Sequence, residues 1–192
     1  MSLVELIAQA DERGLAASGL ACLDRCVPLL GGDDEILRPL WASLAESEGW
    51  GEDWGERVEQ ARAKLDVPGF PAGGGFAEGE AAVLAQRMLG AVPVDRGAGN
   101  LREWADACSV AALQIHRLLD AASDGASSVT ARREGRTQDM SPLVAAELRR
   151  QIAILELLSA HGPAGLRQAL DLSTEGRRVL RAVVSRRARG RV

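Results

Sequence analysis

The sequence contains no tyrosine, and Phe and Trp together supply only 3% of its 192 residues. It also has few isoleucines, and no run in which β-branched or aromatic residues alternate with polar ones. Such runs are the pattern that predicts strands. Apolar residues still make up 46% of the chain, mainly as Ala and Leu, which favour helix. These features predict an all-α fold with a sizeable core.

Cysteine and long apolar runs are also scarce. Three cysteines at scattered positions exclude a disulfide framework, because such a framework needs an even number. No apolar run approaches the roughly 18 residues of a membrane span, and no basic segment of a secretory signal opens the chain. We therefore expect a cytoplasmic protein with no membrane span. Arginine outnumbers lysine by 22 to one, a bias typical of GC-rich bacterial genomes.

The net charge of −4 is distributed unevenly along the chain. Residues 173–192 hold seven Arg and one Glu, hence +6. Residues 1–172 hold 16 basic and 26 acidic residues, hence −10. The chain therefore combines an acidic body with a basic C-terminal end.

The clearest helix is predicted over residues 141–161. Ser141 is a favoured N-cap, Pro142 suits the first helical position, and Gly162 can end the helix. A broad apolar stripe indicates packing against two or more neighbours; it consists of Val144, Leu148, Ile152, Leu155 and Leu158. The more polar side is marked by Glu147, Arg149, Arg150 and Glu156.

A second long helix is predicted over residues 100–122. Asn100 and Glu103 fit a capping box at its start, and apolar residues recur along one side. We expect an irregular helical bundle of seven to nine helices around these two long central helices.

Shorter helices account for most of the remaining chain. One begins near Arg38 or is kinked at Pro39, because proline clashes with the preceding turn inside a helix; the others span about 3–13, 16–30, 52–65, 76–91 and 174–187. Residues 123–139 are polar and without periodicity, which predicts a mobile loop that proteases cut first at Arg132, Arg133 or Arg136.

The Gly- and Pro-rich segment 66–75 predicts a linker. It would separate an N-terminal unit of short helices, residues 1–66, from a C-terminal helical bundle, residues 76–192. The alternative is one continuous domain.

Residues able to carry chemistry are few. Cys22 and Cys26 lie four apart and share a helix face, but a zinc site needs two further ligands. We expect them to pack as small apolar side chains, and we expect no bound metal and no cofactor. His116 precedes Asp120 by one turn, a pair that could orient a catalytic imidazole or form a surface ion pair. We assign no catalytic residue.

An acidic segment with two tryptophans is the best candidate for a binding surface. Trp is favoured at the centres of protein interfaces. We predict a protein-binding face formed by Trp50, Glu52, Asp53 and Trp54. The alternative is that both rings close a small N-terminal core.

Arginines near the C-terminus form a candidate basic patch, made of Arg177, Arg178, Arg181, Arg186 and Arg187. Such a patch could contact nucleic acid or an acidic membrane surface, but no aromatic residues are interleaved for specific recognition. It could equally be a solvated helix face, or it could dock onto the acidic body of the same or another copy. We do not expect nucleic acid as the partner.

These features favour a non-enzymatic cytoplasmic protein that acts by binding another protein, either a foreign one or a second copy of itself. It could be an adaptor, a regulatory subunit or an immunity-type partner. Two alternatives stay open. One is a small helical enzyme or ligand-binding protein with a pocket near Cys108 and His116. The other is a nucleic-acid accessory factor that uses the Arg-rich end.

Overall fold

The computed structural model describes residues 1–192 except 47–48, 66–74, 123 and 191–192. Its described part is all-α and contains no strand, which confirms the predicted fold class. In chain order the elements are α1 (Leu3–Gln9), α2 (Glu12–Cys26), the 3-10 turn η1 (Val27–Leu29), α3 (Arg38–Ala45), α4 (Trp54–Leu65), α5 (Phe76–Gly90), α6 (Ala98–Leu119), α7 (Val129–Arg133), α8 (Pro142–His161), the 3-10 turn η2 (Gly162–Gly165) and α9 (Leu166–Arg189). No helix among these is both long and apolar enough to cross a membrane.

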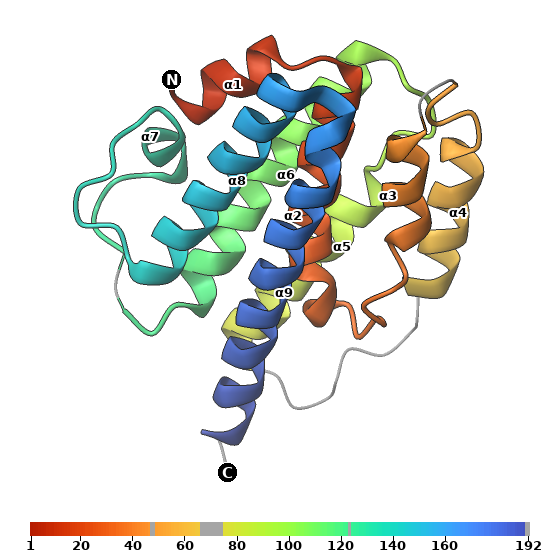
Figure 1. Cartoon of the computed structure of the whole chain (residues 1–192). Helices are drawn as coiled ribbons and strands as arrows, with labels where there is room; N and C mark the ends of the chain where they lie inside the picture. The colour runs from red at the N-terminus through yellow and green to blue at the C-terminus, as the bar shows by residue number, and fades with distance from the viewer. Residues whose placement is uncertain (47–48, 66–74, 123, 191–192) are drawn as a thin grey trace.

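Helix α2 lies at the centre of the bundle. Every residue from Gly14 to Cys26 is buried, because α2 packs against α6, α8 and α9 and also meets α5. Figure 1 shows α2 between the α6–α8 side and the α3–α5 side, with α9 in front of it. Small residues allow this close packing: a Cβ on Gly19 would lie 2.5 Å from the ring of Trp104 on α6. The core is therefore organised around a helix that is buried on all sides.

The two predicted long helices form as α6 and α8, and they pack against each other. The predicted bounds of α8 are confirmed. Its N-cap differs in detail, since the Ser141 hydroxyl makes no capping bond and Asp120 instead accepts a hydrogen bond from the Leu143 amide at 2.7 Å. The capping box predicted at Asn100 is wrong, because α6 begins at Ala98 and the Asn100 amide donates to Asp95.

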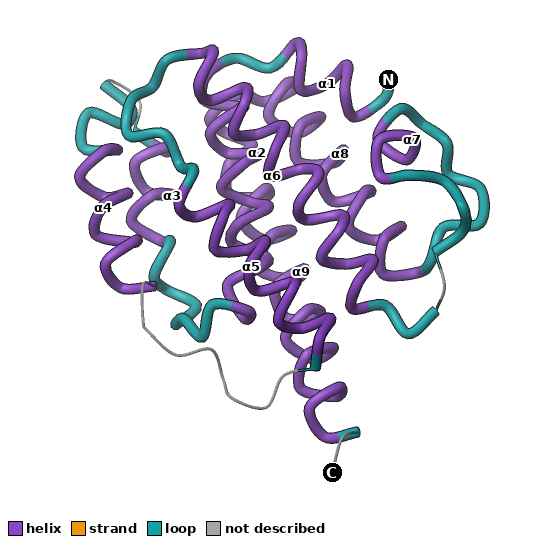
Figure 2. The backbone as a smooth tube through the Cα atoms, turned by 180° about the vertical axis from the view of Figure 1, so that it is seen from behind, coloured by secondary structure: helices purple, strands orange, loops and turns teal. Residues whose placement is uncertain are grey.

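Other helix ends correct the sequence analysis. Helix α1 ends at Gln9, because Asp11 caps α2 by accepting from the Gly14 amide at 2.7 Å and draws Gly14 into α2. Helix α3 begins at Arg38, which places Pro39 in the first turn and removes the need for a kink. Helix α9 begins at Leu166, eight residues before the predicted start, and its last turns project beyond the bundle (Figures 1 and 2).

Within residues 124–139, the segment before α8 contains the short helix α7 and is arranged around one buried arginine; that the segment is mobile and is cut first by proteases stays a prediction. Arg132 is 1% exposed, and its guanidinium donates to the backbone carbonyls of Arg136, Gln138 and Asp139. It also contacts the carboxylate of Asp124, which accepts from the Ser141 amide at 2.9 Å. Charge-assisted bonds to carbonyls therefore hold a polar segment that has little apolar surface to bury.

Side chains before and after residues 66–74 contribute to one cluster of buried apolar residues. Leu20 of α2 and Leu113 of α6 both belong to it. The predicted linker lies outside the described residues apart from Gly75, so the linker itself stays a prediction. The packing of α2 nevertheless places N-terminal residues among the helices of the C-terminal half (Figure 2).

Candidate functional site

Trp54 is a core residue. Its side chain is fully buried, and its indole N–H donates to the Pro93 carbonyl at 2.8 Å. The edge of one ring faces the other in the Trp50–Trp54 pair, with centroids 6.5 Å apart. The two rings therefore do not form a joint surface anchor, and this part of the predicted binding face is corrected. The physical reason is that the segment folds back onto the loop after α5.

Trp50 is half-buried, and two arginines lie against its ring. The guanidinium groups of Arg13 and Arg96 lie 5.7 Å and 5.6 Å from its ring centroid, within the range of cation–π attraction. Arg13 also donates to the Glu46 carbonyl at 3.0 Å. These contacts hold the ring in a fixed orientation at the surface.

The two predicted carboxylates beside these rings differ in accessibility. Glu52 is exposed. Asp53 is half-buried, accepts from the Ser43 hydroxyl at 3.0 Å and pairs with Arg57. Trp50 and Glu52 are thus the members of the predicted face most open to a partner, and their binding role stays a prediction.

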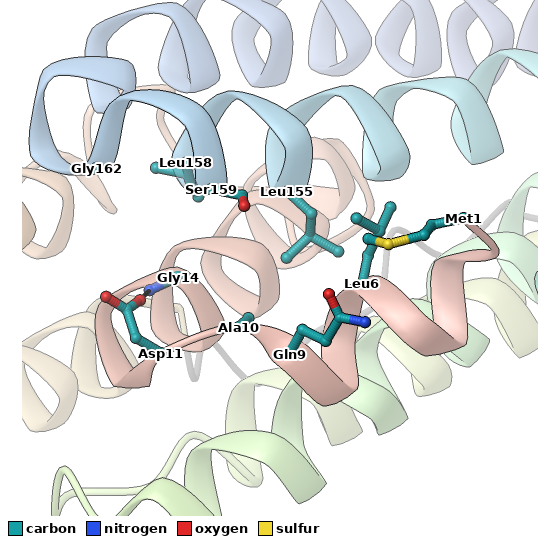
Figure 3. Close-up of a pocket in the computed structure, with 10 residues that line it drawn as sticks. All are labelled: Met1, Leu6, Gln9, Ala10, Asp11, Gly14, Leu155, Leu158, Ser159 and Gly162. Carbon is teal, nitrogen blue, oxygen red and sulfur yellow. Dashed lines mark hydrogen bonds between the residues drawn. The ribbon is translucent and has the colours of Figure 1, made fainter.

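A groove adjoins Trp50 between α1, the start of α2 and the end of α8. It consists of two cavities of about 280 Å³ and 270 Å³ that share Asp11, Gly14, Leu158 and Gly162. Figure 3 shows Leu155 of α8 and Leu6 of α1 directed into the first cavity, with Met1 beside them. The second cavity reaches Trp50. We call these two cavities together the α1–α8 groove.

The rim of the α1–α8 groove is acidic. Asp11 and Glu12 line it and are exposed, whereas the one lining arginine, Arg13, is engaged by Trp50 and Glu46. Helix α8 ends at the groove and α2 begins there, so the negative end of one helix dipole and the positive end of the other both lie at the groove, and the acidic character comes from the side chains. An apolar floor with an acidic rim suits an apolar side chain that has a cation next to it.

Most of the predicted basic patch is bound within the molecule. Arg177 is 6% exposed and donates to Asp24 at 2.5 Å. Arg181 pairs with Asp34, and Arg187 donates to Glu78 at 2.7 Å. Arg178 and Arg186 are exposed. Of the alternatives, docking onto the acidic body of the same copy therefore describes three of the five arginines, because α9 packs against α2 and its Arg187 reaches Glu78 of α5.

The carboxylates that pair with this patch, Asp24 and Asp34, have pKa values shifted in opposite directions. Burial raises the pKa of Asp24, against the opposing effects of Arg177 and of the hydrogen bond from Ser173. The pKa of Asp34, a more accessible carboxylate than Asp24, shifts in the opposite direction, because the hydrogen bond from Arg181 lowers it.

The cysteines are buried free thiols. Cys22, Cys26 and Cys108 have no disulfide partner, and burial raises the pKa of Cys22 to about 12. Nucleophilic chemistry needs the thiolate, which this environment disfavours. Within the described ranges, no group of three or more His, Cys, Asp or Glu side chains is placed to hold a metal.

His116 faces a different carboxylate from the predicted one. It is 1% exposed, and its Nε2 lies 3.5 Å from an oxygen of Glu147, whereas Asp120 caps α8. Burial lowers the pKa of His116, so the ring is neutral at pH 7. With Cys108 also buried, neither side chain of the suggested pocket meets solvent.

A buried polar cluster joins α2, α6 and α8, and the sequence analysis missed it. Arg25 and Glu147 are each fully buried and form two hydrogen bonds of 2.8 Å and 2.6 Å. Gln151 donates to Glu147 at 2.8 Å and accepts from Ser109 at 2.6 Å. Burial is the largest single effect and raises the pKa of Glu147, but the charge of Arg25 and the hydrogen bonds from Arg25 and Gln151 act together against it and bring the pKa down to about 2.

This cluster reaches the surface through α7. Arg133 donates to the Ser109 hydroxyl at 3.0 Å and pairs with the half-exposed Asp106. Apart from the Gln151–Glu147 bond within α8, these links join neighbouring helices, so the cluster fixes how α2, α6, α7 and α8 fit together. The only sequence signal was the spacing that places Glu147 and Gln151 on one face of α8.

A comparison of the chain with protein-family models, with curated proteins and with solved structures gave no match.

Proposed function

We propose that this protein is a non-enzymatic cytoplasmic protein that acts by binding another protein through the α1–α8 groove and the adjoining Trp50. The observation that carries this proposal is the groove itself. Leu6, Leu155 and Leu158 form an apolar floor, and a half-buried tryptophan lies at one end. Aromatic anchors beside apolar pockets supply much of the binding energy of protein interfaces.

The chemistry of the groove specifies the kind of partner. An amphipathic helix offers apolar side chains at spacings of three and four, and such helices bind apolar grooves. The carboxylates of Asp11 and Glu12 favour Lys or Arg beside those side chains and speed the encounter at low salt. The proposed partner is therefore a basic amphipathic helix.

A second copy of the chain is the simplest source of such a helix. The end of α9 projects from the bundle and carries exposed Arg186 and Arg189 beside the half-buried Val183. Analytical ultracentrifugation at rising salt tests this version, with the charge-reversal pair Arg186→Glu and Arg189→Glu as the variant. A parent protein that stays monomeric at low salt rules out the second copy and leaves a foreign helix.

Selection from a displayed library of helical peptides tests the groove without knowledge of the native partner. We expect the selected peptides to carry Leu, Met or Phe at helical spacing with flanking Lys or Arg. Their binding should weaken about tenfold in Glu12→Arg, roughly the 1.4 kcal/mol of one lost ion pair at an interface. The exposed Glu103 of α6 provides the control variant, Glu103→Arg.

The fluorescence of Trp50 reports whether the groove is occupied. The other tryptophans, Trp41, Trp54 and Trp104, are at most 5% exposed, so acrylamide quenches them little. A bound peptide should protect Trp50 from acrylamide quenching. Peptides that bind the parent and Glu12→Arg equally well, or that leave Trp50 quenching unchanged, would show that the partner docks elsewhere.

A further inference from the structure

The outer face of α5 is exposed from one end of the helix to the other. The inner face packs against α6 and meets α2 and η1, and its apolar residues are buried: Ala81, Ala82, Ala85, Met88 and Leu89. The outer face carries residues at alternating spacings of four and three, all of them exposed: Phe76, Glu80, Val83, Arg87 and Gly90. This spacing places them on one side of the helix, as in the seam between two paired helices. We call these five residues the α5 face.

Apolar side chains on the α5 face lie open to solvent. Phe76 is 90% exposed and Val83 is 39% exposed, whereas most large apolar side chains of the described chain are buried. The neighbouring helix α6 widens this apolar surface. Trp104 of α6 contacts α5 through its indole N–H, and the half-buried Ala111 and Leu118 lie seven and fourteen residues further along the same side of α6. Exposed apolar surface that spans two adjacent helices marks an interaction site.

The two charges of the α5 face have no ionic partner within the described part of the chain. Glu80 and Arg87 stand seven residues apart, about 10 Å along the helix axis, which is too far for them to pair with each other. The positions three and four residues from either one are uncharged, so α5 itself supplies no partner. The midpoint between the two charges falls between Val83 and Leu84.

A second copy of α5 supplies both missing partners in one arrangement. When two copies run antiparallel about a two-fold axis at this midpoint, each Glu80 lies opposite Arg87 of the second copy. The same axis places Phe76 opposite Gly90 and Ala91 of the second copy, which are small and exposed. A Cβ added to Gly90 would meet nothing within 4 Å, so the phenyl ring has room there. A parallel arrangement would instead set Glu80 against Glu80.

We propose that this protein forms a two-fold symmetric dimer through the α5 face, with antiparallel α5 helices and Glu80 of each copy paired with Arg87 of the other. Val83 and Leu84 of both copies pack at the centre, and each Phe76 closes one end. Both copies use the same surface, so the contact closes at two subunits. The α1–α8 groove has no lining residue on α5 or α6, so the dimer leaves the groove open and does not rest on the proposed function.

Charge reversal tests this pairing, with analytical ultracentrifugation as the measurement. We expect the parent protein to be dimeric at about 100 µM. Glu80→Arg and Arg87→Glu each set like charges against one another at two symmetric positions, so each should raise the dissociation constant at least about tenfold. The double variant, Glu80→Arg with Arg87→Glu, should dimerise as the parent does, and an equimolar mixture of the two single variants should form a heterodimer. Both positions are exposed, so the fold is retained, which far-UV circular dichroism checks.

Two controls separate this dimer from association through the groove. Glu156→Arg reverses an exposed charge on α8 and should leave the dimer unchanged. Arg186→Glu with Arg189→Glu should also stay dimeric, and loss of the dimer in that variant alone would overturn the proposal and assign self-association to the α1–α8 groove. The proposal is equally overturned if the parent is a monomer at about 100 µM, if either single reversal dimerises like the parent, or if the double variant dimerises no better than the single ones.

Discussion

Removal of Glu147 is expected to destabilise the protein strongly, because it would leave the guanidinium of Arg25 buried and without a carboxylate. Both side chains are 0% exposed, and Arg25 would retain one weak contact, to the Cys22 sulfur at 3.5 Å. Guanidinium cannot release its proton to escape the penalty. Breaking a fully buried pair in this way costs about 3–5 kcal/mol. We therefore expect Glu147→Leu to lower the free energy of unfolding by that amount.

The double variant gives the sharper result. Arg25→Met combined with Glu147→Leu removes both charges, and buried pairs replaced by apolar residues are often neutral or stabilising. Gln151 keeps its bond to Ser109, so little polar surface is stranded. We expect the double variant to be more stable than Glu147→Leu by at least about 2 kcal/mol. Urea unfolding at pH 7 measures all four corners of this cycle.

The same pair predicts the response to acid. Folding lowers the pKa of Glu147 to about 2 from an ordinary value near 4.5, so the unfolded chain takes up the proton first as the pH falls. About 3 kcal/mol of stability is then lost between about pH 5 and pH 2. The lowered pKa of His116 acts in the same direction, starting below its ordinary value of 6.5.

Two results would refute the reasoning on Arg25 and Glu147. One is a cost below about 1 kcal/mol for Glu147→Leu, which would mean that the guanidinium reaches water. The other is a double variant whose loss equals the sum of the two single losses, because independent sites add and paired sites do not.

Further variants test the packing and the loop. Trp54→Ala should lower the free energy of unfolding by about 3–5 kcal/mol in urea, since the ring is fully buried. A loss near zero would show that the ring is not part of the core. Gly19→Ala should cost about 1–3 kcal/mol through its clash with Trp104. Gly79→Ala in α5, with nothing within 4 Å, should instead stabilise by about 0.5–1 kcal/mol. Arg132→Gln should speed tryptic cleavage before α8 about tenfold by freeing three carbonyls, and an unchanged rate would contradict its ordering role.

Local patterns predicted the fold class and the long helices well. The apolar stripe and the Pro142 and Gly162 signals place α8 within its observed bounds, because they act over a few residues. The start of α9 was missed, since Pro163 and the glycines around it indicated a longer loop. The structure forms a 3-10 turn over that stretch and continues directly into α9.

The same patterns could not predict the buried polar contacts. Glu147 was assigned to the wetter side of its helix, and its partner Arg25 lies 122 residues away in the chain. Trp54 stands among carboxylates, and its acceptor, the Pro93 carbonyl, lies 39 residues away. Hydrophobic periodicity describes one helix at a time, so it cannot show that a distant charge or carbonyl satisfies a buried group.

The central position of α2 has a consequence for how the chain folds during synthesis. Helix α2 leaves the ribosome before its partners. Two of its buried charges, Arg25 and Asp24, are neutralised by Glu147 and by Arg177, which lies 153 residues beyond Asp24. Its apolar surface is covered by α6, α8 and α9, all of which follow it in the chain. Contacts between such distant residues slow folding and leave apolar surface exposed meanwhile. The nascent N-terminal helices should therefore need a chaperone, or should stay unfolded, until α9 has emerged.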